Sequence, residues 1–252
     1  MRNAVGRHAG KLPGASCEPQ DNGDRVKRLF AVVLLTVVAL PAQAQVRRRV
    51  PGVPEPAAWV SLGIGLFNGS DVSDGATSST WDFGRASIPQ YRASLEKAIN
   101  NTTSIGLTGS YVHAPFSYIG EGGTASCTQC AAHLNMLSLA ASAHMGGGRG
   151  LHQVLEAAAG VINYRNLERD SDGAALAPTG GNVDPYFTFG YGFGYNFDAV
   201  TEMSVVQDFG LALHERTGLT SQQSNTLTQR TLRLNFRYGF GNRGQVRGRP
   251  RR

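Results

Sequence analysis

Large aromatic residues alternate with small or polar ones along one segment of the chain. Aromatic side chains occupy every odd position from 187 to 197, and threonine, glycine or asparagine occupies the even positions. This period of two predicts a β-strand, because successive side chains of a strand point to opposite faces. An aromatic face opposite a glycine-rich face is typical of a membrane barrel wall, whose outer face meets lipid. The alternative is an aromatic-rich strand of a soluble sheet. The predicted lipid-facing band consists of Phe187, Phe189, Tyr191, Phe193, Tyr195 and Phe197.

Seven further segments show the same alternation and predict an all-β fold of eight strands. Two neighbouring segments are rich in alanine, so a helical hairpin over residues 133–164 is the competing interpretation there. The expected strands, besides the aromatic one, cover residues 59–67, 90–99, 103–113, 133–145, 151–164, 201–215 and 228–240.

The connections between these segments alternate between short and long. Short connections of this kind are periplasmic turns in outer-membrane barrels, and long ones lie outside the cell. We therefore expect an eight-stranded antiparallel up-and-down transmembrane β-barrel. The short connections are residues 100–102, 146–150 and 198–200, and the long ones are residues 68–89, 117–132, 165–184 and 216–227.

The N-terminal region carries the pattern of a secretory signal. A basic run, Arg25–Arg28, precedes the apolar run Leu29–Leu40, and small residues then lead to a cleavage site after Ala44. The apolar run is too short for a transmembrane helix of about 20 residues. We expect residues 1–44 to be a signal peptide in which residues 1–25 are a spurious upstream extension, with translation starting at Val26.

The mature chain then divides into three parts. We expect a periplasmic segment over residues 45–58, the barrel over 59–240 and a basic tail over 241–252. The formal net charge of +6 could indicate nucleic-acid binding. However, the positive residues concentrate in the leader and at the two ends of the mature chain, and an exported protein meets no DNA. Basic ends fit anionic lipid or another polyanion better.

The chain resembles the small eight-stranded outer-membrane barrel family, which includes the OmpA transmembrane domain and the OmpW- and Ail-like proteins. The resemblance covers Trp59–Phe240 and includes a terminal assembly signal of alternating apolar residues, formed here by Phe236, Tyr238 and Phe240. Family members usually end at that aromatic, whereas this chain continues for twelve residues. The resemblance implies location in the bacterial outer membrane, contact with outer-membrane lipid and insertion by the barrel-assembly machinery. It also implies a structural or surface-interaction role, or alternatively a narrow channel or carrier for small or hydrophobic solutes.

Charged residues within the strands fall mostly on the predicted inner face. An eight-stranded barrel is just wide enough for side chains to fill it, and buried charges must pair. We therefore expect a lumen plugged by ion pairs, with Arg233 and Arg237 opposite Glu156, Glu96 or Asp208. The glycines of the aromatic strand are the one hint of a narrow pore. The predicted network consists of Arg92, Glu96, Glu156, Glu202, Asp208, Arg233 and Arg237.

The remaining candidate chemistry is sparse. Cys127 and Cys130 are expected to form a disulfide in an oxidising compartment; a metal site with His133 is the alternative, although it lacks a clear fourth ligand. His214 with Glu215 and Ser221 or Ser224 is a candidate catalytic set of a lipid-modifying enzyme, but the expected His-x-Ser spacing is absent.

We therefore predict no enzyme, no cofactor and no metal. The long polar loops are candidates for binding a surface ligand. A secreted lipocalin-like barrel, with an apolar interior and a polar exterior, is the alternative to a membrane protein.

Overall fold

A computed structural model describes residues 55–84, 87–120, 127–179, 182–215, 218–219 and 223–241. The predicted signal peptide, its upstream extension and most of the two terminal segments lie outside these residues. The described residues contain no helix that is long and apolar enough to cross a membrane.

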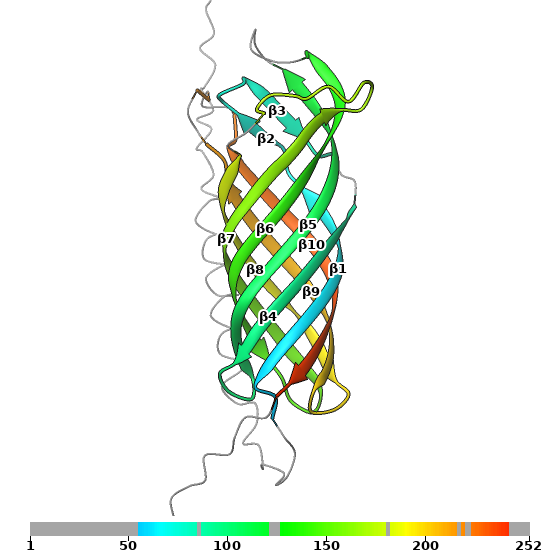
Figure 1. The fold of residues 1–252 in the computed structure, drawn as a ribbon, viewed down its shortest axis with the longest axis vertical. Coiled ribbons are helices and arrows are strands. Elements are labelled where there is room, and N and C mark those ends of the chain that lie inside the picture. Colours follow the sequence, from blue (N-terminus) through cyan, green and yellow to red (C-terminus); the bar gives the residue numbers. More distant parts are fainter. Residues whose placement is uncertain are drawn as a thin grey trace, which may run out of the picture. The chain divides into compact units, whose positions relative to one another are not determined.

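Eight long antiparallel strands close into a barrel (Figure 1). Each long strand pairs with the next one along the chain, and β1 pairs with both β4 and β10, which closes the ring. The predicted fold class is therefore confirmed. The strands are β1 (Ala58–Gly69), β4 (Ile88–Ala98), β5 (Thr103–Gly120), β6 (Gln129–Gly146), β7 (Gly150–Arg169), β8 (Val183–Asn196), β9 (Thr201–Leu213) and β10 (Thr226–Phe240).

The alanine-rich region is part of the barrel wall. β6 and β7 pair along almost their whole length, from Ala132 with Arg169 to Gly146 with Val154. The helical hairpin considered for residues 133–164 is therefore wrong. In this wall, small residues face one another across the two strands, for example Ala140 and Gly160, and the period-two pattern outweighs the helix propensity of alanine.

The long-connection end carries strand structure that the alternation did not predict. A hairpin of β2 (Val72–Asp74) and β3 (Ser79–Asp82) lies within the expected loop 68–89. β3 pairs with the end of β5, from Ser79 with Gly120 to Asp82 with Ser117. The connections expected at residues 117–132 and 165–184 are shorter in the structure, because β5, β6 and β7 extend into them. Backbone hydrogen bonds between β3 and β5 and the packing of apolar side chains into the interior hold this end of the barrel together. Its outer face therefore needs no alternation of apolar and polar residues.

The barrel interior has two layers. An apolar cluster that includes Phe67, Trp81 and Phe116 fills the end near the long connections, and the β2–β3 hairpin contributes to it. Charged side chains fill the part nearer the short turns. The candidate functional groups are therefore held on rigid strands, inside a closed wall.

Candidate functional site

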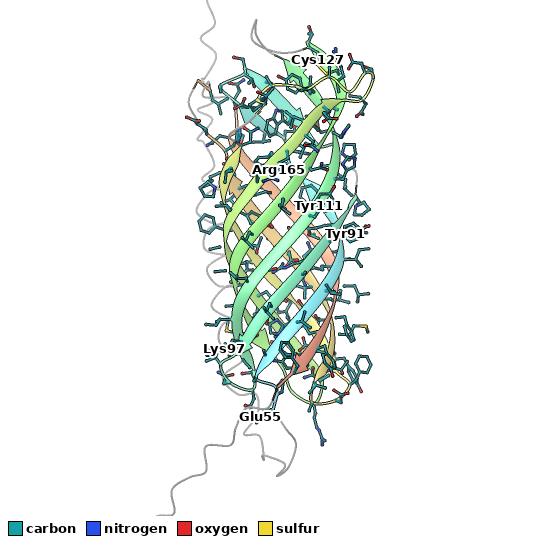
Figure 2. The ribbon with its side chains drawn as sticks, viewed as in Figure 1. Glu55, Tyr91, Lys97, Tyr111, Cys127 and Arg165 are labelled. Carbon is teal, nitrogen blue, oxygen red and sulfur yellow. A yellow bond between two sulfur atoms is a disulfide. The ribbon has the colours of Figure 1, made fainter. Side chains whose placement is uncertain are left out.

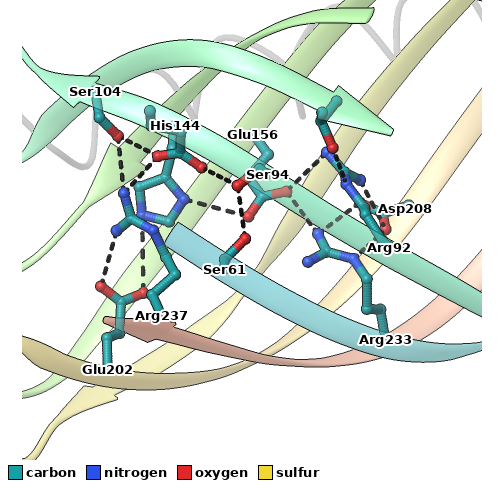
Figure 3. Close-up of polar contacts among 12 residues, drawn as sticks. Ser61, Arg92, Ser94, Ser104, His144, Glu156, Glu202, Asp208, Arg233 and Arg237 are labelled. Atoms are coloured by element: carbon teal, nitrogen blue, oxygen red, sulfur yellow. Dashed lines mark hydrogen bonds and ion pairs between the residues drawn. The ribbon is translucent and has the colours of Figure 1, made fainter. Parts of the chain in front are cut away.

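Arg233 forms one of two centres in the charged layer, at the end that also contains Arg92 and Asp208 (Figure 3). Its Nε atom donates to Asp208 Oδ2 at 2.8 Å, and Nη2 donates to Glu156 Oε2 at 2.5 Å. Arg92 approaches the same two carboxylates at 3.3 and 3.5 Å and donates from Nε to Thr108 Oγ1 at 2.8 Å. Two guanidinium groups thus share two carboxylates contributed by β7 and β9.

Arg237 forms a second centre nearer the short turns. Its Nη2 atom donates to Glu96 Oε2 at 2.6 Å, and Nη1 donates to Glu202 Oε2 at 3.1 Å. The same guanidinium group lies 4.5 Å from the centre of the Trp59 ring, a cation–π distance. Ser94 and Ser104 donate to Glu96 as well, so this carboxylate is fully engaged.

All seven charged residues expected to face the interior lie in these two groups. Inner and outer positions alternate regularly around these seven residues, and every second residue of β10 reaches the lumen. From the sequence we expected Arg233 and Arg237 to lie opposite Glu156, Glu96 or Asp208. In the structure Arg233 contacts Glu156 and Asp208, and Arg237 contacts Glu96. Glu202 is the additional partner of Arg237.

Glycines on the inner face of β8 and β1 make room for this network. A Cβ atom at Gly190 would collide with the carboxylate of Asp208, and one at Gly63 would lie 3.0 Å from Cδ of Arg233. The glycines of the aromatic strand, which hinted at a pore, therefore accommodate charged side chains that cross the lumen.

Two histidines that sequence reasoning left unassigned belong to the charged layer. The Nδ1 atom of His144 lies 3.2 Å from Glu156 Oε1. His152 Nδ1 lies 3.0 Å from the carbonyl oxygen of Gly150. Both histidines are buried, and both occupy even positions, on the opposite face from the exposed Leu139 and Leu151. Their position in the alternation was the signal that could have placed them inside.

A separate buried group lies at the long-connection end. His214 follows β9; its Nδ1 atom lies 2.8 Å from Asp184 Oδ2, and its Nε2 atom lies 3.1 Å from Asp74 Oδ1. The ring also packs 5.2 Å from Trp81, measured between ring centres. Asp74 and Trp81 belong to the β2–β3 hairpin, so His214 connects this hairpin to the barrel.

The hydrogen bonds of His214 shift its own pKa and that of Asp74 in opposite directions. Burial alone would lower the pKa of His214, but its hydrogen bonds to Asp184 and Asp74 outweigh burial and raise the pKa to about 9. Burial would raise the pKa of Asp74, but hydrogen bonds from His214 and Thr77 lower it. The imidazolium ring between two carboxylates therefore persists at neutral pH.

This arrangement does not match the candidate catalytic set around His214. Both ring nitrogens face carboxylates, so neither is available to a serine hydroxyl. Ser224 Oγ accepts instead from the backbone N–H of Thr226 at 3.3 Å, and Ser221 lies outside the described residues.

We expect alkaline pH to release the hairpin. Because the folded pKa of His214 lies above its usual value, its stabilising effect is complete below about pH 6.5 and is lost as pH rises through about 9. Fluorescence of Trp81, measured in a Trp59→Phe background, should therefore shift between pH 8 and 10. A His214→Gln variant should show little of this shift. An equal shift in that variant would contradict the assignment.

The two cysteines are joined in a disulfide at the long-connection end (Figure 2). Both pack against the apolar cluster. The alternative metal site does not fit, because the thiols are consumed and His133 Nδ1 contacts Asp170 Oδ1 at 2.7 Å. The disulfide thus closes a tight loop at the start of β6.

The outer face of the barrel is apolar on every long strand. In the aromatic band, Phe187 is 48% exposed and Phe193 is 51% exposed, and Phe197 lies just beyond the end of β8. Phe236, Tyr238 and Phe240 also point outward and lie beside β1. Large apolar side chains are therefore directed away from the lumen around the whole barrel.

No family model and no curated protein matches the chain. Among solved structures, Neisserial surface protein A has a TM-score of 0.46 at 12% identity, covering 73% of this chain and 97% of that one. Ail of Yersinia pestis has a TM-score of 0.37 at 12% identity, covering 73% and 99%. The outer membrane enzyme PagL has a TM-score of 0.33 at 14% identity, covering 72% and 99%. This similarity concerns the fold alone.

Proposed function

We propose that the protein spans the bacterial outer membrane as a closed, non-conducting barrel with a structural or surface-interaction role. The observation that carries this proposal is the combination of an exposed apolar exterior with an interior filled by ion pairs and aromatic side chains. The proposed location includes export with a signal peptide cleaved after about Ala44.

The exterior supports a membrane rather than an aqueous environment. A closed barrel pairs all its strands, which satisfies the backbone polar groups in lipid. Contiguous exposed apolar surface is rare on soluble monomers. A lipocalin-like barrel would need a polar exterior, whereas here Leu62, Leu107 and Phe193 are each more than half exposed. Ion pairs in the lumen also differ from the apolar interior that such a carrier requires.

The interior supports a plugged barrel rather than a channel. Between the charged layer and the apolar layer lies a cavity of about 10 Å³, lined by residues that include Gln90, Thr108 and Tyr186. That volume is about the size needed for one water molecule. A solute would have to displace both layers to pass.

Three kinds of partner follow from this proposal. Outer-membrane lipid would contact the apolar exterior, and the barrel-assembly machinery would recognise the end of β10. A surface ligand would contact the long connections, where a cavity of about 420 Å³ opens beside β7 and is lined by Arg165, Glu168 and Asn182.

An enzymatic role is not part of the proposal, because His214 is held by two carboxylates.

The first experiment is electrophoresis of the outer-membrane fraction, in which the unboiled protein should migrate faster than the boiled protein. The second is a measurement of ion conductance by the protein in planar bilayers. We expect no ion current from the parent protein. The Arg233→Ala/Arg237→Ala variant should also stay silent, because the apolar layer remains. Replacing residues 72–82 with a short glycine–serine linker in the same variant should produce a current. Steady conductance by the parent would overturn the non-conducting role, and a heat-insensitive soluble protein would overturn the membrane location.

A further inference from the structure

The cavity beside β7 lies between that strand and the segment that returns to β8. Two backbone hydrogen bonds join them: Tyr164 donates to the carbonyl oxygen of Asn182 at 3.0 Å, and Leu176 donates to that of Leu167 at 2.8 Å. Between these two bonds the returning segment has more residues than β7, so the two cannot pair residue by residue. The cavity of about 420 Å³ lies there. Its volume falls in the range of small-molecule sites, about 300–1,000 Å³.

A bulge in β7 places polar side chains at this cavity. The pairing of β7 with β6 shifts by one residue between Arg165 and Glu168. Asn166 lies within the shift and has a positive φ of 52°, which asparagine tolerates better than most residues. Arg165 and Asn166 are therefore both exposed although they are neighbours, and both line the cavity together with Glu168. Bulges often direct side chains in this way next to functional sites.

Arg165 is the uncompensated charge of the cavity. Its Nε atom donates to Asn163 Oδ1 at 3.4 Å, and no carboxylate of the described residues forms an ion pair with its guanidinium group. Glu168, the acidic residue among the described residues that line the cavity, lies instead 3.8 Å from Nε2 of His133. Guanidinium groups bind phosphate and carboxylate through paired N–H donors. The cavity therefore favours a ligand with an anionic group.

The rest of the polar lining suits hydroxyl groups. Asn163, Asn166 and Asn182 each contribute an amide, which has both donors and acceptors. Nδ2 of Asn182 donates to the carbonyl oxygen of Pro178 at 3.1 Å, which leaves Oδ1 as an acceptor. The hydroxyl groups of a saccharide both donate and accept, so they match this mixture. A saccharide that carries an anionic group would use the amides and Arg165 together.

This inference rests on the proposed membrane location, which puts the cavity at the level of the lipid headgroups. Val161 on β7 and Val183 on β8 are exposed apolar residues, and Arg165 follows Val161 on the same face. Tyr91 and Tyr111 are exposed and pair across β4 and β5, and aromatic side chains of this kind mark the membrane interface. Figure 2 shows Arg165 between these tyrosines and the long-connection end. The cavity therefore opens just outside the hydrocarbon layer.

We propose that this cavity binds the headgroup of a glycolipid in the outer leaflet, namely a saccharide that carries a phosphate or carboxylate group. Arg165 would hold the anionic group, and the amides of Asn163 and Asn182 would contact the hydroxyls. The acyl chains of the same molecule would lie along the apolar outer face beside Val161 and Val183. A soluble anionic saccharide has the same headgroup chemistry without these chains, so experiment can separate the two sources.

The test uses the full barrel in detergent micelles and native mass spectrometry, with an acylated glucosamine disaccharide bisphosphate as the probe. We expect one bound probe molecule per chain. Arg165→Gln should weaken binding at least about 10-fold, because a charge-assisted contact is lost. The matched control, Arg230→Gln, changes an exposed arginine on the outer face of β10 and should bind as the parent does. The dephosphorylated probe should bind the parent as weakly as the full probe binds Arg165→Gln.

Equal binding by the parent and Arg165→Gln, an equal loss in the Arg230 control, or no effect of removing the phosphates would overturn the proposal. Displacement of the probe by an equal concentration of water-soluble glucosamine phosphate would assign the cavity to a free saccharide, and the lipid source would be wrong. If Arg165→Gln fails to fold, NMR of the parent gives an independent answer. The side-chain amide signals of Asn163 and Asn182 should shift when the probe is added, and shifts confined to other strands would contradict the site.

Electrophoresis of the same samples keeps this test separate from that of the membrane location. Faster migration of the unboiled protein shows that the barrel is closed and folded. A barrel that migrates in this way but does not bind the probe would overturn this inference alone. A heat-insensitive soluble protein would overturn the membrane location, and the lipid source with it.

Discussion

Replacing Arg233 with alanine is expected to lower the unfolding free energy by about 3–5 kcal/mol, because the change leaves buried charges without their partner. The Arg233 side chain is 1% exposed and contacts the carboxylates of Glu156 and Asp208. Arg92 remains near both carboxylates but at longer distances, so it compensates only in part. Equilibrium urea unfolding in phospholipid vesicles measures the difference.

Two controls separate charge burial from other effects of the substitution. Arg230→Ala, on the same strand but on the exposed outer face, should change stability by no more than about 0.5 kcal/mol. Adding Glu156→Gln to Arg233→Ala should recover much of the loss, since Arg92 then faces the single charged carboxylate of Asp208. Equal losses for Arg230 and Arg233, or no recovery in the double variant, would show that the ion pairs do not hold the lumen together.

The inner and outer faces of the barrel could be predicted from the sequence because side chains alternate regularly between the two faces along most of each strand. β10 alternates over its whole length, so the position of Arg233 and Arg237 in the lumen follows from that of Leu232 and Phe236 on the lipid side. The same rule would have placed His144 and His152 inside. They were left unassigned because a lone histidine does not reveal its partners.

The structure of the long-connection end could not be predicted from this alternation. The β2 strand has three residues, all of them buried, so it shows no alternation. His214 contacts Asp184 and Asp74, which lie 30 and 140 positions away in the chain. Such contacts depend on how the β2–β3 hairpin folds over the lumen. The alternation of residues within a strand carries no information about contacts between residues so far apart in the chain. The expected strand over residues 201–215 also ended too late, at the point where His214 turns inward.

Phe189→Lys tests the lipid-facing exterior and should lower the unfolding free energy in vesicles by about 2–4 kcal/mol, the range for a lysine near the bilayer midplane. Phe189 lies at the middle of β8, is 45% exposed and pairs with Phe209 on β9. A lysine there would place its ammonium group in hydrocarbon, where only partial snorkelling to the interface relieves the penalty.

Val183→Lys is the matched control, because Val183 lies on the same strand and the same face with 49% exposure. Six residues of strand correspond to about 20 Å, or about 15 Å in depth for a strand tilted by about 40°. That displacement brings position 183 to the membrane interface, where the same substitution should lower stability by about 0–1 kcal/mol. A protein in water would show no such depth dependence, since both side chains are equally exposed. Equal effects at the two positions would therefore contradict the membrane location, whereas a clear difference would establish that the aromatic band faces lipid.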